Sequence, residues 1–117
     1  MYGFPPQNEL SNLISKNLIQ ICCTANQINL HFDSDISISI EADQFQVIKN
    51  KEIIEIGIPI NNLTVFELLE HTVTQIETKN SNSTLELHFN DNYKIILTDD
   101  KDYESYHISI NKKEIII

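Results

Sequence analysis

Apolar and polar residues alternate along several short stretches of the chain. Ile28, Leu30 and Phe32 alternate with polar neighbours, residues 36–40 read Ile-Ser-Ile-Ser-Ile, and residues 85–89 repeat the alternation. A period of two places the apolar side chains on one face of a β-strand. One apolar and one polar face are typical of antiparallel sheet. The pattern therefore predicts several half-buried antiparallel strands.

Turn and helix signals separate these strands. The polar stretches 33–35 and 90–92 have the composition of hairpin turns. A short helix is predicted after Thr64, which we interpret as its N-cap, because Glu67 three residues later would complete a capping box. Residues 8–14 form a weaker counterpart near the start of the chain.

The second half of the chain repeats the order of the first. The segment LHFD begins at Leu30 and LHFN begins at Leu87, while Gln20 and Gln75 occupy matching positions at an offset of 55 residues. The offset is 57 at the two leucines, and a two-residue insertion in the polar stretch 79–83 accounts for the change. The parity of the apolar positions is the same in both copies, so Leu30 and Leu87 should both be buried.

These elements predict a mainly β fold, a β-rich α+β class. We expect two tandem repeats of an antiparallel β unit that form one sandwich or barrel-like domain, each repeat opened by a short helix or turn. A chain of 117 residues can bury one core, so residues 1–117 are interpreted as a single domain with internal repeats at approximately 8–58 and 62–117. The apolar stretch 54–60 leaves no polar linker, so the repeats should share one core.

The charge of the chain restricts its partners. All eight basic residues are lysine, and 17 acidic residues give a net charge of -9. Because phosphate binding depends on cationic side chains, this balance argues against nucleic acid and anionic membranes and fits a basic protein partner, or no partner, better. The chain shows no leader pattern and no apolar run long enough to span a membrane, so we expect a cytoplasmic protein with Cys22 and Cys23 reduced.

The motifs of common catalytic and metal sites are missing. His31 and His88 lie at equivalent outward positions, and a twofold arrangement of the repeats could bring them together, but no HxH, HxxxH or HExxH spacing supplies further zinc ligands. The chain has no GxSxG elbow, and Gly3 and Gly57 are too few for a phosphate-binding loop. We therefore expect no catalytic residues, no metal and no cofactor, and interpret the protein as non-enzymatic.

Acidic and aromatic residues gather near the end of the chain. Negative charge beside an aromatic side chain suits the capture of a basic partner. The strand that follows should bury Tyr106, because that residue shares a face with Ile108 and Ile110. The candidate partner-binding residues are Asp99, Asp100, Asp102, Tyr103 and Glu104.

The same segment carries a resemblance to a known family. Tyr103-Glu-Ser-Tyr106, together with the repeated LHFD-like segment, resembles the pattern of a family of small uncharacterised bacterial proteins with two β repeats and a Tyr-Glu-Ala-Trp-like signature. Tyr106 stands where that signature has tryptophan. The resemblance implies a fold of two β repeats, and the family has no assigned activity to carry over.

Taken together, these features favour a binding module of unknown specificity. The form we prefer is an immunity-like or inhibitor protein that masks a basic protein partner. The alternative is a small-ligand- or metal-binding β domain with His31 and His88 close together. The oligomeric state does not follow from the sequence.

Overall fold

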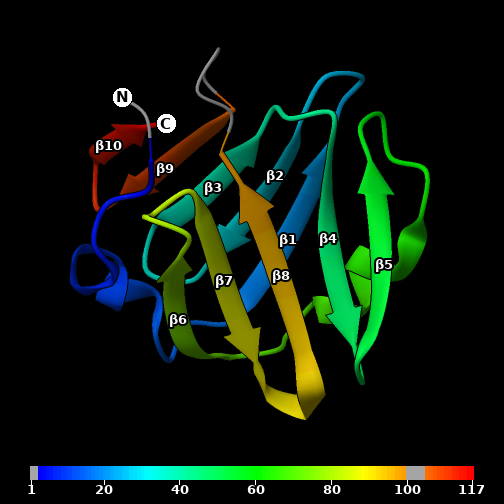
Figure 1. Cartoon of the computed structure of the whole chain (residues 1–117), viewed down its shortest axis with the longest axis horizontal. Helices are drawn as coiled ribbons and strands as arrows, with labels where there is room; N and C mark the ends of the chain where they lie inside the picture. The colour runs from blue at the N-terminus through cyan, green and yellow to red at the C-terminus, as the bar shows by residue number, and fades with distance from the viewer. Residues whose placement is uncertain (1–2, 100–104) are drawn as a thin grey trace.

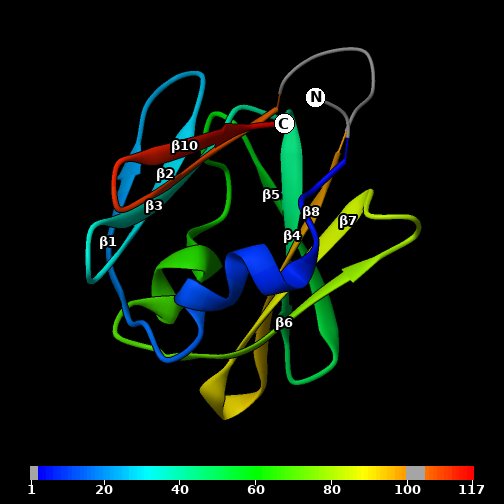
Figure 2. The same ribbon diagram turned by 90° about the vertical axis from the view of Figure 1, so that its left-hand side faces the viewer.

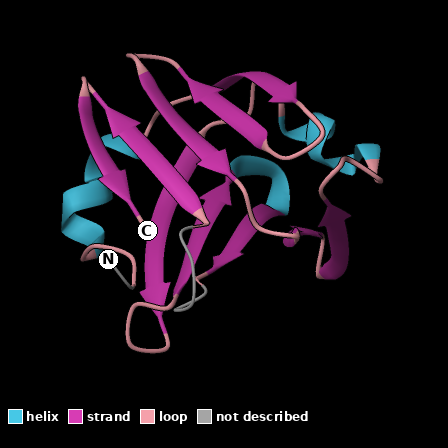
Figure 3. Ribbon diagram, turned by 90° about the horizontal axis from the view of Figure 1, so that it is seen from above, coloured by secondary structure: helices cyan, strands magenta, loops and turns pink. Residues whose placement is uncertain are grey.

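Two antiparallel sheets make up the protein. The computed structural model describes residues 3–99 and 105–117, and within these ranges ten strands form two five-stranded sheets packed face to face (Figures 1 and 3). The first sheet has the order β1 (Leu18–Cys23), β2 (Ile28–Phe32), β3 (Ile36–Ile40), β9 (Tyr106–Ile110) and β10 (Lys113–Ile116). The second sheet has the order β5 (Glu52–Gly57), β4 (Gln44–Lys49), β8 (Tyr93–Thr98), β7 (Thr84–Phe89) and β6 (Val73–Lys79). The predicted mainly β class and its sandwich form are confirmed.

Each half of the chain contributes strands to both sheets. The first half builds β1, β2 and β3 and then crosses to the second sheet as β4 and β5, whereas the second half builds β6, β7 and β8 and then crosses back as β9 and β10. The crossing strands complete the sheets because β9 pairs with β3 and β4 pairs with β8. Each sheet is therefore completed by two strands from the other half of the chain.

The predicted apolar faces meet in one core. Leu30 and Leu87 are both buried, as their equal parity predicted, and the rings of Phe32 and Phe89 stack with centroids 6.5 Å apart. One continuous cluster contains buried residues of both sheets. Burial of each large aliphatic or aromatic side chain contributes roughly 1.5–3 kcal/mol to folding, so this interface is the main source of stability.

The predicted hairpin turns are present. Ser34 and Asp35 have φ values of 63° and 60°, and Asp91 and Asn92 have 63° and 66°. Two successive residues with positive φ match the right-handed twist of the strands they connect, and Asp and Asn are enriched in this conformation. In the second half these residues belong to the short helix η3 (Asn90–Asn92).

Two 3₁₀ helices close one end of the core between the sheets (Figure 2). They are η1 (Gln7–Leu13) and η2 (Leu63–Leu68). The predicted cap of the second helix is wrong by two residues, because Asn62 is the N-cap and its side chain accepts a hydrogen bond from the N–H of Thr64. Glu67 does not complete a capping box, since its Oε1 atom accepts a hydrogen bond from Nζ of Lys49 at 2.7 Å.

The two halves make matching backbone contacts with each other. The N–H of Ser15 donates to the carbonyl of Val73, and the N–H of Glu70, at the matching position of the second half, donates to the carbonyl of Leu18. Both β1 and β6 contain an irregularity in register at the same place, between Leu18 and Gln20 in β1 and between Val73 and Gln75 in β6. These contacts agree with the predicted duplication, while superposition of the halves stays a prediction.

The structure also bears on membrane insertion. Among the described residues, no helix has the length and apolar character needed to cross a bilayer.

Candidate functional site

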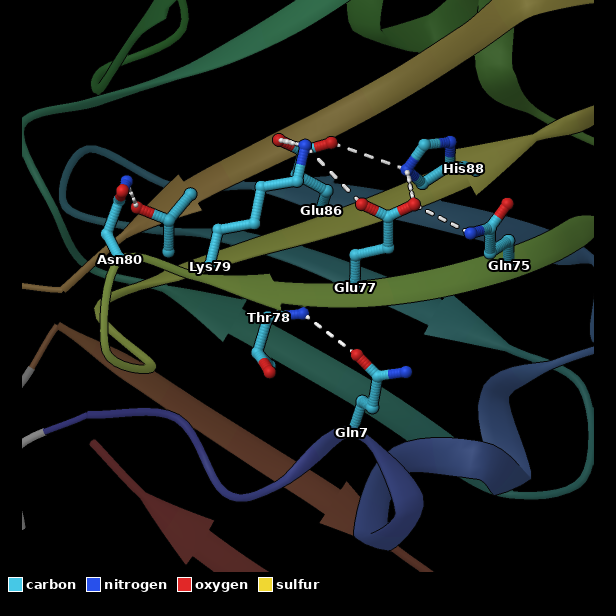
Figure 4. A network of polar contacts seen from close by, with 9 residues as sticks. Gln7, Gln75, Glu77, Thr78, Lys79, Asn80, Glu86 and His88 are labelled. Atoms are coloured by element: carbon cyan, nitrogen blue, oxygen red, sulfur yellow. Dashed lines mark hydrogen bonds and ion pairs between the residues drawn. The ribbon is translucent and has the colours of Figure 1, made fainter.

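The outer face of the second sheet carries a cluster of ionisable side chains. Residues that alternate with the buried positions point outward, and the register of β6 against β7 places Glu77 opposite Glu86 and Gln75 opposite His88. The side chains of Glu77, Glu86 and His88 point toward one another, and Lys79 reaches both carboxylates (Figure 4). We call Glu77, Glu86 and His88 the carboxylate–histidine cluster.

The atoms of this cluster approach one another closely. Nε2 of His88 lies 3.3 Å from Oε1 of Glu86 and 3.7 Å from Oε1 of Glu77. One nitrogen or oxygen from each of the three residues can be chosen so that all three atoms lie within 4.8 Å of one another. Such a constellation of one imidazole and two carboxylates can hold a cation.

Burial distinguishes this cluster from ordinary surface charges. The side chain of Glu86 is only 10% exposed and that of His88 is 17% exposed. Within residues 3–99 and 105–117, Oε1 of Glu86 and Nε2 of His88 make no hydrogen bond, and their contact with each other at 3.3 Å is an ion pair only if the histidine is protonated. A buried polar atom without a partner is costly, so it calls for a functional or structural explanation.

Lys79 compensates part of the negative charge. Its Nζ atom lies 3.1 Å from Oε2 of Glu86 and 3.4 Å from Oε2 of Glu77. The hydrogen bond to Glu86, followed by that to Glu77, raises the pKa of Lys79 above its ordinary value of 10.5. The lysine therefore binds the Oε2 atoms and leaves both Oε1 atoms on the side of His88.

An open hollow adjoins the cluster on the same face. It has a volume of about 630 Å³, and Ile48 and Ile53 supply apolar lining while Gln75, His88 and Lys94 supply polar groups. His88 therefore belongs both to the cluster and to the wall of the hollow. A surface of this kind can bind a small molecule or a side chain of a partner.

His31 and His88 do not approach each other. His31 lies between buried Leu30 and Phe32 on β2, and His88 lies between buried Leu87 and Phe89 on β7. Since the buried residues fill the space between the sheets, each histidine points outward from a different sheet. The structure therefore excludes a shared site of these two histidines, which the sequence had left open.

The predicted partner-binding residues are only partly within the structure. Asp99 is buried, and its Oδ2 atom accepts a hydrogen bond from the N–H of Gly3. The other four residues lie outside the described part of the chain: Asp100, Asp102, Tyr103 and Glu104. Asp99 therefore ties the N-terminal segment to the end of β8 and is not a freely exposed charge.

Tyr106 has the position that its parity predicted. It is buried, its ring lies 5.3 Å from that of Phe4, and its hydroxyl donates a hydrogen bond to the carbonyl of Thr98 at 2.7 Å. Tyr106 is therefore a core residue.

Sequence reasoning missed Glu77 and Glu86. The alternation in residues 85–89 did place Glu86 and His88 on one outward face, which is a Glu-x-His pattern on a strand. Recognising Glu77 as the third member requires the register of β6 against β7, which the sequence alone does not fix.

No family model, curated protein or solved structure matches this chain. The resemblance to the family of small bacterial proteins therefore stays a prediction, and functional inference rests on the geometry above.

Proposed function

We propose that this protein is a non-enzymatic binding module that masks a basic protein partner, in the manner of an immunity or inhibitor protein. The net charge of -9 supports a positively charged partner, since a strongly acidic protein attracts a basic one and repels acidic competitors. The non-enzymatic part of the proposal rests on the missing catalytic motifs of the sequence.

One backbone contact supports the place that we propose for the binding surface. The N–H of Glu41 donates to the carbonyl of Ser105 at 2.7 Å, which brings the connection between β3 and β4 beside Ser105 at the start of β9. Glu41 and Asp43 on that connection are exposed. We call the end of the sandwich that carries Glu41 and Asp43 the acidic end, and the acidic candidates predicted from the sequence, Asp100, Asp102 and Glu104, precede Ser105 along the chain.

The proposal is tested with the full chain and its cognate partner. The partner is isolated by crosslinking in its own host and identified by mass, and its association rate is then measured at increasing salt concentration. We expect a basic protein whose association slows as salt rises.

Charge-matched variants locate the surface. Glu41→Gln with Asp43→Asn should slow association and flatten its salt dependence, because both changes remove charge from the acidic end. Glu52→Gln with Asp91→Asn removes the same charge at exposed positions in the hairpin regions at the other end of the sheet and should leave the rates nearly unchanged. Equal rates for the two pairs, or an acidic partner, would contradict the proposal.

The hollow beside His88 favours a second candidate, the binding of a small ligand. Its volume of about 630 Å³ lies within the range of ligand-binding pockets. A native mass spectrum of protein purified from its host would show a bound small mass if this candidate is correct.

A further inference from the structure

We propose that Glu77, Glu86 and His88 form a binding site for a divalent transition metal, and that zinc is the ion that this site fits. This inference does not depend on the proposed partner. It goes beyond the sequence, which led us to expect no metal site, because it uses a third ligand that only the register of β6 and β7 reveals.

The spacing of the glutamate oxygens around His88 is close to that of zinc ligands. Tetrahedral zinc binds nitrogen and oxygen at about 2.0–2.2 Å, so its ligand atoms lie roughly 3.3–3.6 Å from one another. Nε2 of His88 is 3.3 Å from Oε1 of Glu86 and 3.7 Å from Oε1 of Glu77. The first distance lies within this range and the second is slightly longer, while all three ligand atoms lie within 4.8 Å of one another, so small side-chain movements would complete the site. Three protein ligands leave the fourth position for water.

The contact between Glu86 and His88 points to a ligand at this place. Oε1 of Glu86 and Nε2 of His88 are buried and make no hydrogen bond among the described residues, and their contact with each other at 3.3 Å is an ion pair only if the histidine is protonated. Figure 4 marks the contact between these two atoms, so they face each other. A metal ion would satisfy both atoms at once, because the lone pairs of imidazole and carboxylate are its preferred ligands.

The surrounding side chains hold the carboxylates in place. Lys79 contacts the Oε2 atoms of Glu77 and Glu86, so it neutralises charge without occupying the Oε1 atoms. Nε2 of Gln75 donates to Oε1 of Glu77 at 2.6 Å, and a carboxylate oxygen has a second lone pair for a metal. Hydrogen-bonded carboxylates of this kind are typical of metal sites, where outer groups orient the ligands.

The matching place on the first sheet supplies a control. Cys22 pairs with Asn29 there, as Glu77 pairs with Glu86, and His31 stands where His88 stands. Both carboxylates are thus missing from that face, while a histidine is retained. A variant of His31 therefore tests whether any outward histidine on a central strand would bind zinc.

The test is a titration of the full chain, freed of metal with a chelator, with zinc chloride and separately with cobalt chloride. We expect one zinc ion per chain by calorimetry and the visible absorption of tetrahedral cobalt. His88→Gln and Glu77→Gln should each weaken zinc binding at least about tenfold, because even the loss of an outer group commonly costs that much. His31→Gln should bind zinc like the wild type.

Two further measurements exclude simpler explanations. The pair Cys22→Ser and Cys23→Ser should retain zinc, which separates this cluster from the free thiols. Zinc should also raise the melting temperature of the wild type and of His31→Gln but not that of His88→Gln, provided that all three melt alike in chelator. Absence of zinc and cobalt binding in the wild type would overturn the proposal. Binding that is lost in the cysteine pair and kept in His88→Gln would overturn it as well.

Discussion

The outer faces of the two sheets have matching positions but different side chains. On the second sheet, Glu77 pairs with Glu86 beside His88. The matching pair on the first sheet is Cys22 with Asn29 beside His31. The inner faces differ much less, since both present large apolar residues to one core. The packing of the sandwich therefore does not require the carboxylates of Glu77 and Glu86, so their presence on one face needs a separate reason.

The side chains around Glu86 are also more apolar than those around Asn29, the matching residue of the first sheet. Ile96 lies beside Glu86 on β8, whereas Ser39 lies beside Asn29 on β3. Ile48 pairs with Lys94 in the second sheet, and Ser109 pairs with Ser37 in the first. Apolar neighbours lower the local dielectric constant and strengthen electrostatic interactions. The second sheet thus places its charges where they interact strongly.

The largest expected effect tests whether the two halves contribute equally to the core. Phe32→Ala and Phe89→Ala should each cost about 3–5 kcal/mol of unfolding free energy, because both rings are buried and leave a cavity. The rings stack on each other, so the double variant should lose less than the sum of the two changes. Urea unfolding of the three variants measures this. A small loss for one phenylalanine and a large loss for the other would show that the halves are not equivalent in the core.

The shared features are those that the sequence predicts best. Inward and outward parity is a local property, so alternation alone placed Leu30 and Leu87 in the core. The crossing between sheets is not local, because only the three residues 41–43 separate β3 from β4 and nothing in them signals a change of sheet. The pairing of β3 with β9 joins segments about 70 residues apart, and such contacts depend on the whole fold.

The second expected effect tests the burial of Glu86. In chelator, Glu86→Leu should raise the unfolding free energy by about 1–2 kcal/mol, because it replaces a buried carboxylate, whose Oε1 makes no hydrogen bond, with an apolar side chain that packs against Ile96. Asn29→Leu on the first sheet removes no such group and should change stability less. Urea unfolding compares the two variants, and a destabilised Glu86→Leu would mean that Lys79 already compensates the carboxylate fully.

Only part of the carboxylate–histidine cluster could be predicted from the sequence. Glu86 and His88 lie on one predicted strand, so their common face follows from alternation. The position of Glu77 opposite Glu86 depends on the register of β6 against β7. This register shifts between Val73 and Gln75, and the turn between the strands has positive φ at all of residues 80–82. A bulge moves a side chain to another neighbour, so counting residues along the chain does not identify the partner.

A third, smaller effect compares the two histidines directly. In chelator, His31→Gln and His88→Gln should each change the unfolding free energy by no more than about 0.5 kcal/mol, because both side chains point away from the core. With zinc present, only His88→Gln should lose the added stability. Thermal melts with and without zinc measure both differences. A loss of the zinc effect in His31→Gln would remove the distinction between the two faces.

The smallest effect concerns pH and the lysine of the cluster. Hydrogen bonds to Glu86 and then to Glu77 raise the pKa of Lys79 above 10.5, so the folded protein favours the charged amine. A group whose folded pKa is raised stabilises the protein fully below its unfolded pKa and loses this contribution as pH rises through the folded pKa. Melting temperatures of the wild type and Lys79→Gln should therefore differ by a constant amount near neutral pH and converge above pH 10.5.

The Glu86→Leu background provides the control for this last comparison. It removes the largest cause of the raised pKa, so Lys79→Gln should there have a smaller effect that varies less with pH. Other lysines and tyrosines titrate in the same range, but they are present in both members of each pair and cancel in the difference. Because the lysine is exposed to solvent and screened by it, the difference should also shrink as salt is added. A difference that persists unchanged above pH 10.5 would show that Lys79 acts through packing of its aliphatic stem rather than through its charge.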